Sequence, residues 1–471
     1  ASIRSSLTAG CSPTAKVVRP PSDMPEAAIR FFTIVTNLKP AEAAGYNNLA
    51  STLRGMGKYD EAIEVLRTAV NLEPENPKLW NTLGIAAQDG GHPAEALTFY
   101  QEALRLDPGF AEAQANIGVF LLEEGRFAEA VDPLTAAIRL DPGDARAHFN
   151  HSIALAAVGR FAEAWEEYEW RHDPVIPSSS FHHHDFPTWD NEDISDKGLL
   201  ICTEQGIGDD IQFASMYRET IPLAGHCLIE CDPRLTTLYR RSFPGATPIP
   251  SESYQKDGKR HRTYPFLQSD PPIEYAIVAG SLTRKFRQTK ESFQGHTPYL
   301  VPDPQRVELW RQRLDELGPG LKVGVCWRSM MMTVLRKKFY SEIEEWRPVF
   351  EVPGIEFVNL QYDDCTEELA LMKENFGATL HVWEDTNLKD DLETVAALIS
   401  ELDLVITAGT MIHAMAGALD VPTWLFGLHK HDGYRWYDKL EIFSQAEAGG
   451  RKPLFENIAK ALAERVAEPV A

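Results

Sequence analysis

Apolar and small residues in the first third of the chain recur with a period of 34 residues. Prolines recur at Pro40, Pro74, Pro108 and Pro142. Alanines recur at Ala28, Ala62, Ala96, Ala130 and Ala164, and glycines at Gly57, Gly91, Gly125 and Gly159. Between them, apolar residues fall on one face of each of two helices per repeat. The pattern predicts a series of antiparallel helix pairs.

Each recurring residue has a structural reason. The glycine ends the first helix, the alanine lets the two helices approach closely, and the proline stops the second helix. Trp80 is the aromatic residue that opens one first helix, and Gly84 and Gly118 occupy the small-residue position of two first helices. This pattern resembles tetratricopeptide repeats. We expect a half repeat at 24–40, full repeats at 43–76, 77–110 and 111–144, and a last repeat ending near 171. Such arrays form an α-solenoid whose concave face binds an extended peptide or another protein.

Beyond the repeats, short apolar runs alternate with helical segments. The predicted strands are 198–203, 226–231 and 274–279, followed after a proline-rich joint by 322–327, 355–360, 379–383, 403–407 and 423–426. Continuous apolar strands between helices are typical of parallel sheets that are covered on both faces. The fold class is therefore α plus α/β, a solenoid followed by two Rossmann-like domains that face a cleft. Ligands in such domains bind beyond the carboxyl ends of the strands.

These patterns divide the chain into five segments. We expect a disordered leader at 1–21, the repeats at 22–172 and a linker at 173–196. Two Rossmann-like domains follow at 197–300 and 301–471, the second ending in a helix. The linker contains His182, His183 and His184. Three consecutive histidines cannot all face one metal from a regular element, so a chance or weakly metal-binding surface tract is favoured over a catalytic site there.

The charge of the chain excludes some classes of protein. It has 471 residues and a formal net charge of −23. A nucleic-acid-binding protein needs clustered lysine and arginine, so we expect no nucleic-acid partner. We also expect no membrane span and a cytoplasmic location, because long apolar runs are missing. The six cysteines are scattered and favour buried thiols in a reducing compartment.

Residues 42–171 hold 21 acidic and 10 basic side chains, a net charge of −11. Two interpretations stay open for this acidic segment. Its charges either form a solvated face that keeps the solenoid soluble, or they line a groove that selects a partner with basic or amide-rich segments.

The first candidate functional loop follows the strand at 198–203. Gly206 and Gly208 allow a tight turn and close approach of a ligand, and a helix begins directly after them. Asp209 is either the N-cap of this helix or a general base that points into the cleft.

Two further loops follow strands of the second domain. Trp327 and Arg328 precede a basic cluster with Arg336 and Lys338, which is either a solvated turn or a site that stabilises a departing phosphate. The other loop holds Gly409 and Thr410, which form a nest for a phosphate at a helix start. His413, one turn into that helix, faces either the ligand or the core.

Three runs carry a resemblance to a known family: 203–213, 323–327 and 403–419. They resemble bacterial glycosyltransferases related to the lipopolysaccharide heptosyltransferases, in particular the branch that fuses tetratricopeptide repeats to the transferase and includes flagellin glycosyltransferases. The resemblance implies a GT-B fold, a nucleotide-sugar donor held mainly by the second domain, and transfer without a metal or other cofactor. It implies that Asp209 is the base, that Arg336 to Lys338 form the basic loop, and that Thr410 and His413 contact phosphate.

We therefore expect a glycosyltransferase whose repeats recruit the acceptor, and we expect that acceptor to be a protein hydroxyl. One position departs from the family, because Gly409 stands where an aspartate usually precedes the threonine. This departure keeps open a noncatalytic scaffold with a degenerate transferase domain. A transferase that acts on lipid-linked or lipopolysaccharide glycans is a further alternative.

Overall fold

The computed structural model describes residues 25–264, 271–329, 339–376, 380–431 and 436–467. The described residues form two compact units. The repeat unit comprises residues 25–158 and 167–175, and the sheet unit comprises residues 159–166 and those from 176 onward. The expected leader at 1–21 lies outside the described residues. No described helix combines the length and the apolar character that a membrane span requires.

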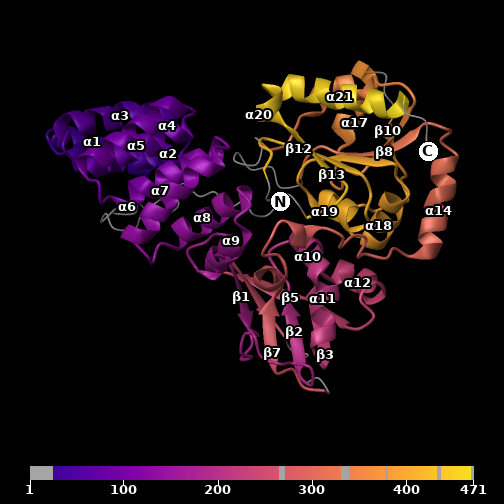
Figure 1. Cartoon of the computed structure of the whole chain (residues 1–471). Coiled ribbons are helices and arrows are strands. Elements are labelled where there is room, and N and C mark those ends of the chain that lie inside the picture. Colours follow the sequence, from indigo (N-terminus) through magenta and orange to yellow (C-terminus); the bar gives the residue numbers. More distant parts are fainter. Residues whose placement is uncertain (1–24, 265–270, 330–338, 377–379, 432–435, 468–471) are drawn as a thin grey trace. The chain divides into compact units, whose positions relative to one another are not determined.

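The helices of the repeats follow the predicted period (Figure 1). They are α1 Pro25–Leu38, α2 Ala43–Gly55, α3 Tyr59–Leu72, α4 Pro77–Asp89, α5 Pro93–Leu106, α6 Ala111–Glu123, α7 Phe127–Leu140, α8 Ala145–Ala157 and α9 Phe161–Tyr168. The glycine after each first helix adopts a left-handed φ, between +72° and +80° in all four repeats. Because this region is open to glycine at little steric cost, the predicted helix ends are confirmed.

Close helix packing explains the small residues of the repeats. Ala62, Ala96 and Ala130 are completely buried. A Cβ atom at Gly84 would lie 2.5 Å from Cε1 of Tyr100, and one at Gly118 would lie 2.4 Å from Cγ of Leu134. The backbone of each first helix therefore rests directly on a large side chain of the second helix.

Gly118→Ala is expected to destabilise the repeat unit by about 1–3 kcal/mol, because the added methyl group overlaps Leu134 in a packed core. Hydrogen exchange of the α6 and α7 amides measures the effect. Adding Leu134→Ala removes the clash, so the double variant should lose less stability than the sum of the single changes. Gly55→Ala is the control, since nothing lies within 4 Å of its added Cβ. Equal effects of both alanine changes would contradict this packing.

The first sheet of the sheet unit is parallel throughout. Its strands are β2 Gly198–Cys202, β3 His226–Cys231, β4 Thr247–Pro250 and β7 Tyr275–Val278, in the order β4-β3-β2-β7. Its main helices are α10 Ile207–Phe213, α11 Tyr217–Thr220, α12 Thr236–Ser242 and α13 Thr283–Phe286. Three of the strands match the prediction, and β4 was missed.

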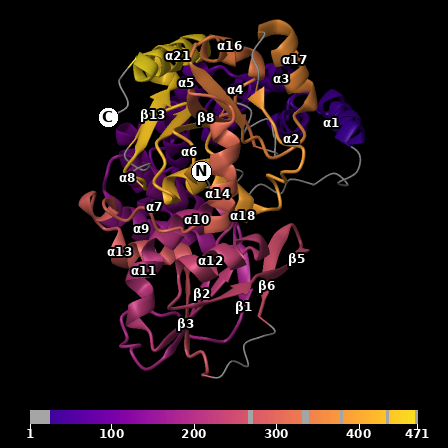
Figure 2. The same ribbon diagram turned by 90° about the vertical axis from the view of Figure 1, so that its right-hand side faces the viewer.

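The expected linker at 173–196 is wrong in one respect, because it contributes a strand. Strand β1 Ser180–His183 pairs in parallel with β6 Lys259–Thr263, which pairs with β5 Glu252–Lys256. These three strands form a separate sheet beside the first one (Figure 2). Phe186 packs against the apolar core of the first sheet, and Trp189 is buried.

The second main sheet has six parallel strands in the order β10-β9-β8-β11-β12-β13. They are β8 Leu321–Cys326, β9 Ile355–Asn359, β10 Leu380–His381, β11 Leu404–Thr407, β12 Thr423–Gly427 and β13 Leu440–Ser444. Its helices are α14 Pro304–Asp315, α16 Arg347–Phe350, α17 Thr366–Phe376, α18 Leu392–Ser400, α19 Met411–Ala418, α20 Gln445–Ala448 and α21 Arg451–Ala467. The prediction missed β13.

The strand orders locate where a ligand would bind. Counted within its own sheet, the second sheet has the order 3-2-1-4-5-6, which is that of doubly wound nucleotide-binding sheets. In the second sheet, successive strands are added on one side from β8 to β10 and on the other side from β11 to β13, so the switch point lies between β8 and β11. In the first sheet, the switch point lies between β2 and β7. Crevices form at such switch points, beyond the carboxyl ends of the strands. The loops that the sequence singled out all follow β2, β8 or β11.

Candidate active site

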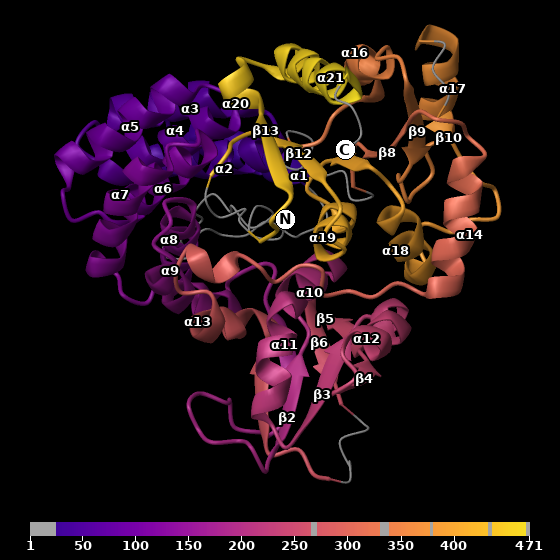
Figure 3. The same cartoon turned by 45° about the vertical axis from the view of Figure 1, so that its right-hand side comes forward.

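The structure brings two of the three candidate loops together. Helix α10 follows β2 and packs against α19, which follows β11 (Figure 3). A Cβ atom at Gly208 would lie 3.7 Å from Cα of Met411, the first residue of α19. Gly206 has an extended backbone with φ −150°, so its conformation does not require glycine. The starts of the two helices are therefore close together, although a methyl group at Gly208 would be in ordinary van der Waals contact.

Asp209 lies in the first turn of α10, and the alternative that it is the N-cap is wrong. The N-cap is Gly206, and the helix begins at Ile207, earlier than the predicted start near 210. Asp209 is 7% exposed. Burial, together with the nearby charge of Asp209, raises the pKa of Tyr437. The Asp209 carboxylate is therefore close enough to Tyr437 for their charges to interact.

The adjacent Asp210 has a different role. Its carboxylate accepts hydrogen bonds from the Thr203 hydroxyl and, at 2.9 Å, from the backbone N–H of Glu204. The Tyr239 hydroxyl donates to the backbone carbonyl of Asp210 at 2.9 Å. Asp210 therefore fixes the loop after β2, and Asp209 is the neighbouring carboxylate in the first turn of α10.

Burial raises the pKa of Asp210 to about 7, above the 3.8 of an exposed aspartate. The folded protein therefore holds this proton more tightly than the unfolded chain does. The resulting stabilisation is complete below about pH 4 and is lost as the pH rises through about 7. Asp210→Asn should remove this loss of stability. The difference in melting temperature between the variant and the wild type should therefore grow in favour of the variant between about pH 5 and about pH 8. A constant difference across that range would contradict the assignment.

At the start of α19, Thr410 and His413 are both buried. The Thr410 hydroxyl caps the helix, because it accepts a hydrogen bond from Ile412 N–H at 3.2 Å. Neither ring nitrogen of His413 has a hydrogen-bond partner among the described residues. Burial lowers the pKa of His413 to about 3, so the imidazole is neutral at physiological pH. Its ring packs edge-on against Tyr437, with the ring centroids 5.3 Å apart.

The third candidate loop is only partly described. Trp327 is completely buried in the core of the second main sheet. The Arg328 guanidinium is bound by carboxylates, since it contacts Asp363 and donates to Glu368 from Nε at 2.5 Å. Arg328 is therefore already neutralised within the protein. Arg336 and Lys338 lie outside the described residues, so their phosphate contact stays a prediction.

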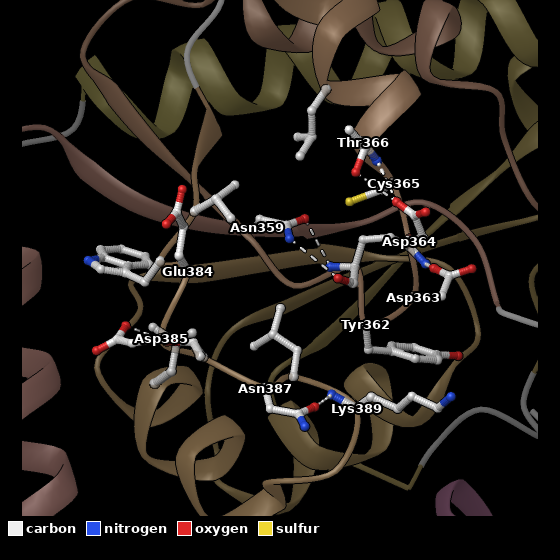
Figure 4. A pocket seen from close by; sticks show the side chains of 17 residues that line it. Asn359, Tyr362, Asp363, Asp364, Cys365, Thr366, Glu384, Asp385, Asn387 and Lys389 are labelled. Carbon is white, nitrogen blue, oxygen red and sulfur yellow. Dashed lines mark hydrogen bonds between the residues drawn. The ribbon is translucent and has the colours of Figure 1, made fainter.

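The sequence analysis missed a pocket at the ends of β9 and β10 (Figure 4). Its volume is about 490 Å³. Its polar lining includes four carboxylates, those of Asp363, Asp364, Glu384 and Asp385, together with neutral amides and hydroxyls and the cation of Lys389. Arg328 pairs with Asp363, and Arg313 pairs with Asp385. Apolar surface comes from Tyr362, Leu369, Val382, Trp383 and Leu388. Such a mixed lining suits a neutral ring with hydroxyl groups.

A chain of contacts joins this pocket to the start of α19. Gln361, 2% exposed, accepts from Arg328 N–H at 3.2 Å and donates to the Arg328 carbonyl at 3.0 Å. The Cys326 thiol lies 3.6 Å from Oε1 of Gln361 and 3.8 Å from Oγ1 of Thr410. These buried contacts thus connect the ends of β8, β9 and β11. Gln361 carried no recognisable motif, because its partners are distant in sequence.

The comparisons with known proteins agree with the repeat architecture. Residues 41–109, 81–145 and 121–169 match the tetratricopeptide repeat family. The first third of the chain is a tetratricopeptide repeat array. Such arrays bind peptides or other proteins, which supports a protein-binding role for the repeat unit.

One curated relative extends beyond the repeats. Protein FlbA of Caulobacter vibrioides is 34% identical over 308 residues, which cover 64% of this chain and 52% of FlbA. The chain thus spans about half the length of this relative.

Similar solved structures include MamA and YrrB, the latter described as a repeat protein with an unusual peptide-binding site. MamA is 24% identical, with 31% of this chain and 85% of MamA covered and a TM-score of 0.29. YrrB is 26% identical, with 32% and 78% covered and a TM-score of 0.27. A thermophilic repeat protein of Thermus thermophilus is 21% identical, with 32% and 84% covered and a TM-score of 0.29.

Proposed function

We propose that the sheet unit is a glycosyltransferase of the GT-B fold, which transfers a sugar from a nucleotide-sugar donor to a protein hydroxyl. The observation that carries the proposal is the packing of α10 on α19, which places Asp209 beside the start of a helix that follows the switch-point strand β11. A carboxylate next to an anion-binding helix start is the arrangement that sugar transfer from a diphosphate requires.

In this proposal, the donor lies along the carboxyl edge of the second main sheet. The nucleoside occupies the pocket at β9 and β10, where carboxylates accept hydrogen bonds from ribose hydroxyls. The diphosphate meets the free N–H groups at the start of α19, close to Thr410 and His413. Neutral His413, whose ring nitrogens are unpartnered among the described residues, can donate one hydrogen bond to a phosphate oxygen.

The transfer step then needs a base and a stabilised leaving group. The Asp209 carboxylate takes the proton of the acceptor hydroxyl while its oxygen forms a bond to the anomeric carbon of the sugar. The bond from that carbon to the diphosphate breaks, and the nucleoside diphosphate leaves with the electron pair. Arg336 and Lys338 neutralise the negative charge that develops on it. These cations supply the role that a metal has in other transferases.

The repeat unit supplies the acceptor. Its acidic character, with 21 acidic and 10 basic residues at 42–171, favours a partner with basic or amide-rich segments. The resemblance of the sequence to flagellin glycosyltransferases supports a flagellin-like protein as that partner.

A panel of nucleotide sugars tests the donor site by thermal shift, because a ligand that binds only the folded form raises the melting temperature. We expect one nucleotide sugar to stabilise the wild type. Val382→Trp, which fills the pocket with an indole ring, should weaken that binding at least about 10-fold. Val301→Trp is the matched control, because Val301 is 40% exposed and lies outside the pocket lining.

A noncatalytic scaffold is the competing function, and Gly409 favours it, since the resembling family has an aspartate there. In that case no nucleotide or nucleotide sugar stabilises the wild type, while a protein partner still binds the repeats. This outcome would overturn the transferase proposal.

A further inference from the structure

A group of buried and half-buried metal-ligating side chains lies beside the loop that leads to α10. His182 on β1, Cys202 at the end of β2 and Glu230 on β3 place their ligand atoms within 4.8 Å of one another. The Cys202 thiol also lies 3.7 Å from Nε2 of His184. Cys202 and Glu230 are at most 1% exposed.

The alternation of the extended chain explains why two histidines meet here. Neighbouring side chains of a strand point to opposite faces, so His182 and His184 share one face and His183 has the other. His183 contacts His261 on the solvent side, with 2.8 Å between Nε2 and Nδ1. Three consecutive histidines indeed do not converge, but two of them do.

We propose that His182, His184, Cys202 and Glu230 bind one divalent transition-metal ion, with zinc the best match. Imidazole nitrogen, thiolate sulfur and carboxylate oxygen are the ligands that zinc takes in proteins, usually four in a tetrahedron. With zinc bonds of about 2.0 Å to nitrogen and about 2.3 Å to sulfur, the two atoms stand about 3.5 Å apart along a tetrahedral edge. The observed 3.7 Å between Cys202 and His184 matches this edge.

Surrounding groups support the ion. The Tyr264 hydroxyl lies 2.5 Å from Nδ1 of His182 and donates to Oε2 of Glu230 at 2.9 Å, so it orients two ligands at once. Nδ1 of His184 is buried and has no hydrogen-bond partner among the described residues. Nε2, the other ring nitrogen of His184, faces Cys202 and is therefore the atom that would bind the ion.

The charge of the region also favours a cation. Glu204, Glu230 and Asp210 are buried carboxyl groups around one buried guanidinium, that of Arg262. Arg262 contacts Glu230 at 3.4 Å and also donates to the Glu204 carbonyl. A bound divalent cation would stabilise the ionised Glu230 carboxylate, which is its ligand form. Binding the metal releases the Cys202 proton, since the thiolate is the ligand form.

The ion would be structural. It joins β1 to the ends of β2 and β3, directly before the segment from Thr203 to Gly206 that leads into α10. The backbone N–H of Thr203 already donates to Glu230 at 2.9 Å. The proposed ion is separate from the proposed donor site.

Titration of the chelator-stripped full chain with Co²⁺ tests the proposal, because a thiolate ligand gives cobalt a charge-transfer band that histidines alone do not. We expect one Co²⁺ per chain with this band, and displacement by Zn²⁺. Cys202→Ser should abolish the band, and His184→Ala should weaken binding at least about 10-fold. His183→Ala and Cys227→Ser are the controls and should retain the band.

Two results would overturn the site. One is a wild-type chain that takes up Co²⁺ without the thiolate band, as the exposed His183 and His261 pair would. The other is a band that survives Cys202→Ser. Because the first result is read on the wild type, it does not depend on whether a variant folds. Zn²⁺ should also raise the melting temperature of the wild type and of His183→Ala, but not that of Cys202→Ser.

Discussion

Asp209→Asn is expected to lower the turnover of sugar transfer by about 10²- to 10⁴-fold, the usual contribution of a positioned base. Asparagine keeps the size of the side chain but cannot accept the proton of the acceptor hydroxyl. The side chain is 7% exposed and lies in the first turn of α10, so its backbone geometry should not change. Turnover with a nucleotide-sugar donor and an excess of acceptor measures the loss.

Measuring donor binding distinguishes the loss of the catalytic base from the loss of the donor site. The nucleotide sugar should stabilise Asp209→Asn as much as it stabilises the wild type, because the proposed donor contacts lie on the second main sheet. Asp315→Asn is the matched control, since Asp315 is an exposed residue of α14, and it should keep full turnover. Full turnover of Asp209→Asn would remove Asp209 from the role of base.

Trp165→Ala should destabilise the sheet unit by about 3–5 kcal/mol, the usual loss for truncating a buried tryptophan. Trp165 is 2% exposed, and its indole N–H donates to the Arg287 carbonyl at 2.6 Å. Its ring also packs near Phe293 and Trp436, with centroid distances of 6.5 and 6.2 Å. Truncation would remove this packing and leave the carbonyl without its donor.

Hydrogen exchange read by mass spectrometry assigns the loss to one unit. Amides of β2, β3 and β7 should lose protection in Trp165→Ala, although Trp165 falls within the last sequence repeat. Trp80→Ala is the control, because Trp80 is half-buried in the repeat unit and donates to the Pro74 carbonyl at 2.8 Å. Its effect should be smaller and confined to the repeats. Loss of protection only in α1 to α8 after Trp165→Ala would contradict the assignment.

The periodic parts of the fold could be predicted because the same contacts between helices recur in each repeat. Four glycines with a left-handed φ mark the same helix end in successive repeats. Three fully buried alanines mark the same contact between the two helices of a repeat. The strands of the two main sheets could also be predicted where they are buried on both faces. Strands β5 and β6 were missed because they are largely polar and sit outside those sheets. The pair Asp257-Gly258, with φ +52° and +73°, is a hairpin signal that could have revealed them.

The candidate site was predictable where its residues lie on a loop that follows a strand. The sequence led to the loops of Asp209 and Thr410, and the structure brings them together. It did not lead to the pocket, because Tyr362, Trp383 and their neighbours form no motif until β9 and β10 lie side by side. Nor could it show that Arg328 is neutralised, since Asp363 and Glu368 follow it by 35 and 40 residues.

Helix α9 has a consequence for how such a protein can be divided or recombined. Its residues from Phe161 to Glu166 belong with the sheet unit, although the 34-residue period assigns them to the repeats. A fragment that starts after residue 175 would lose Trp165 and expose Phe293 and Trp436 to water. Exchange of the repeat array for another should therefore join the chains before Gly159. Recombination at the segment 173–196 would separate the sheet unit from part of its own core.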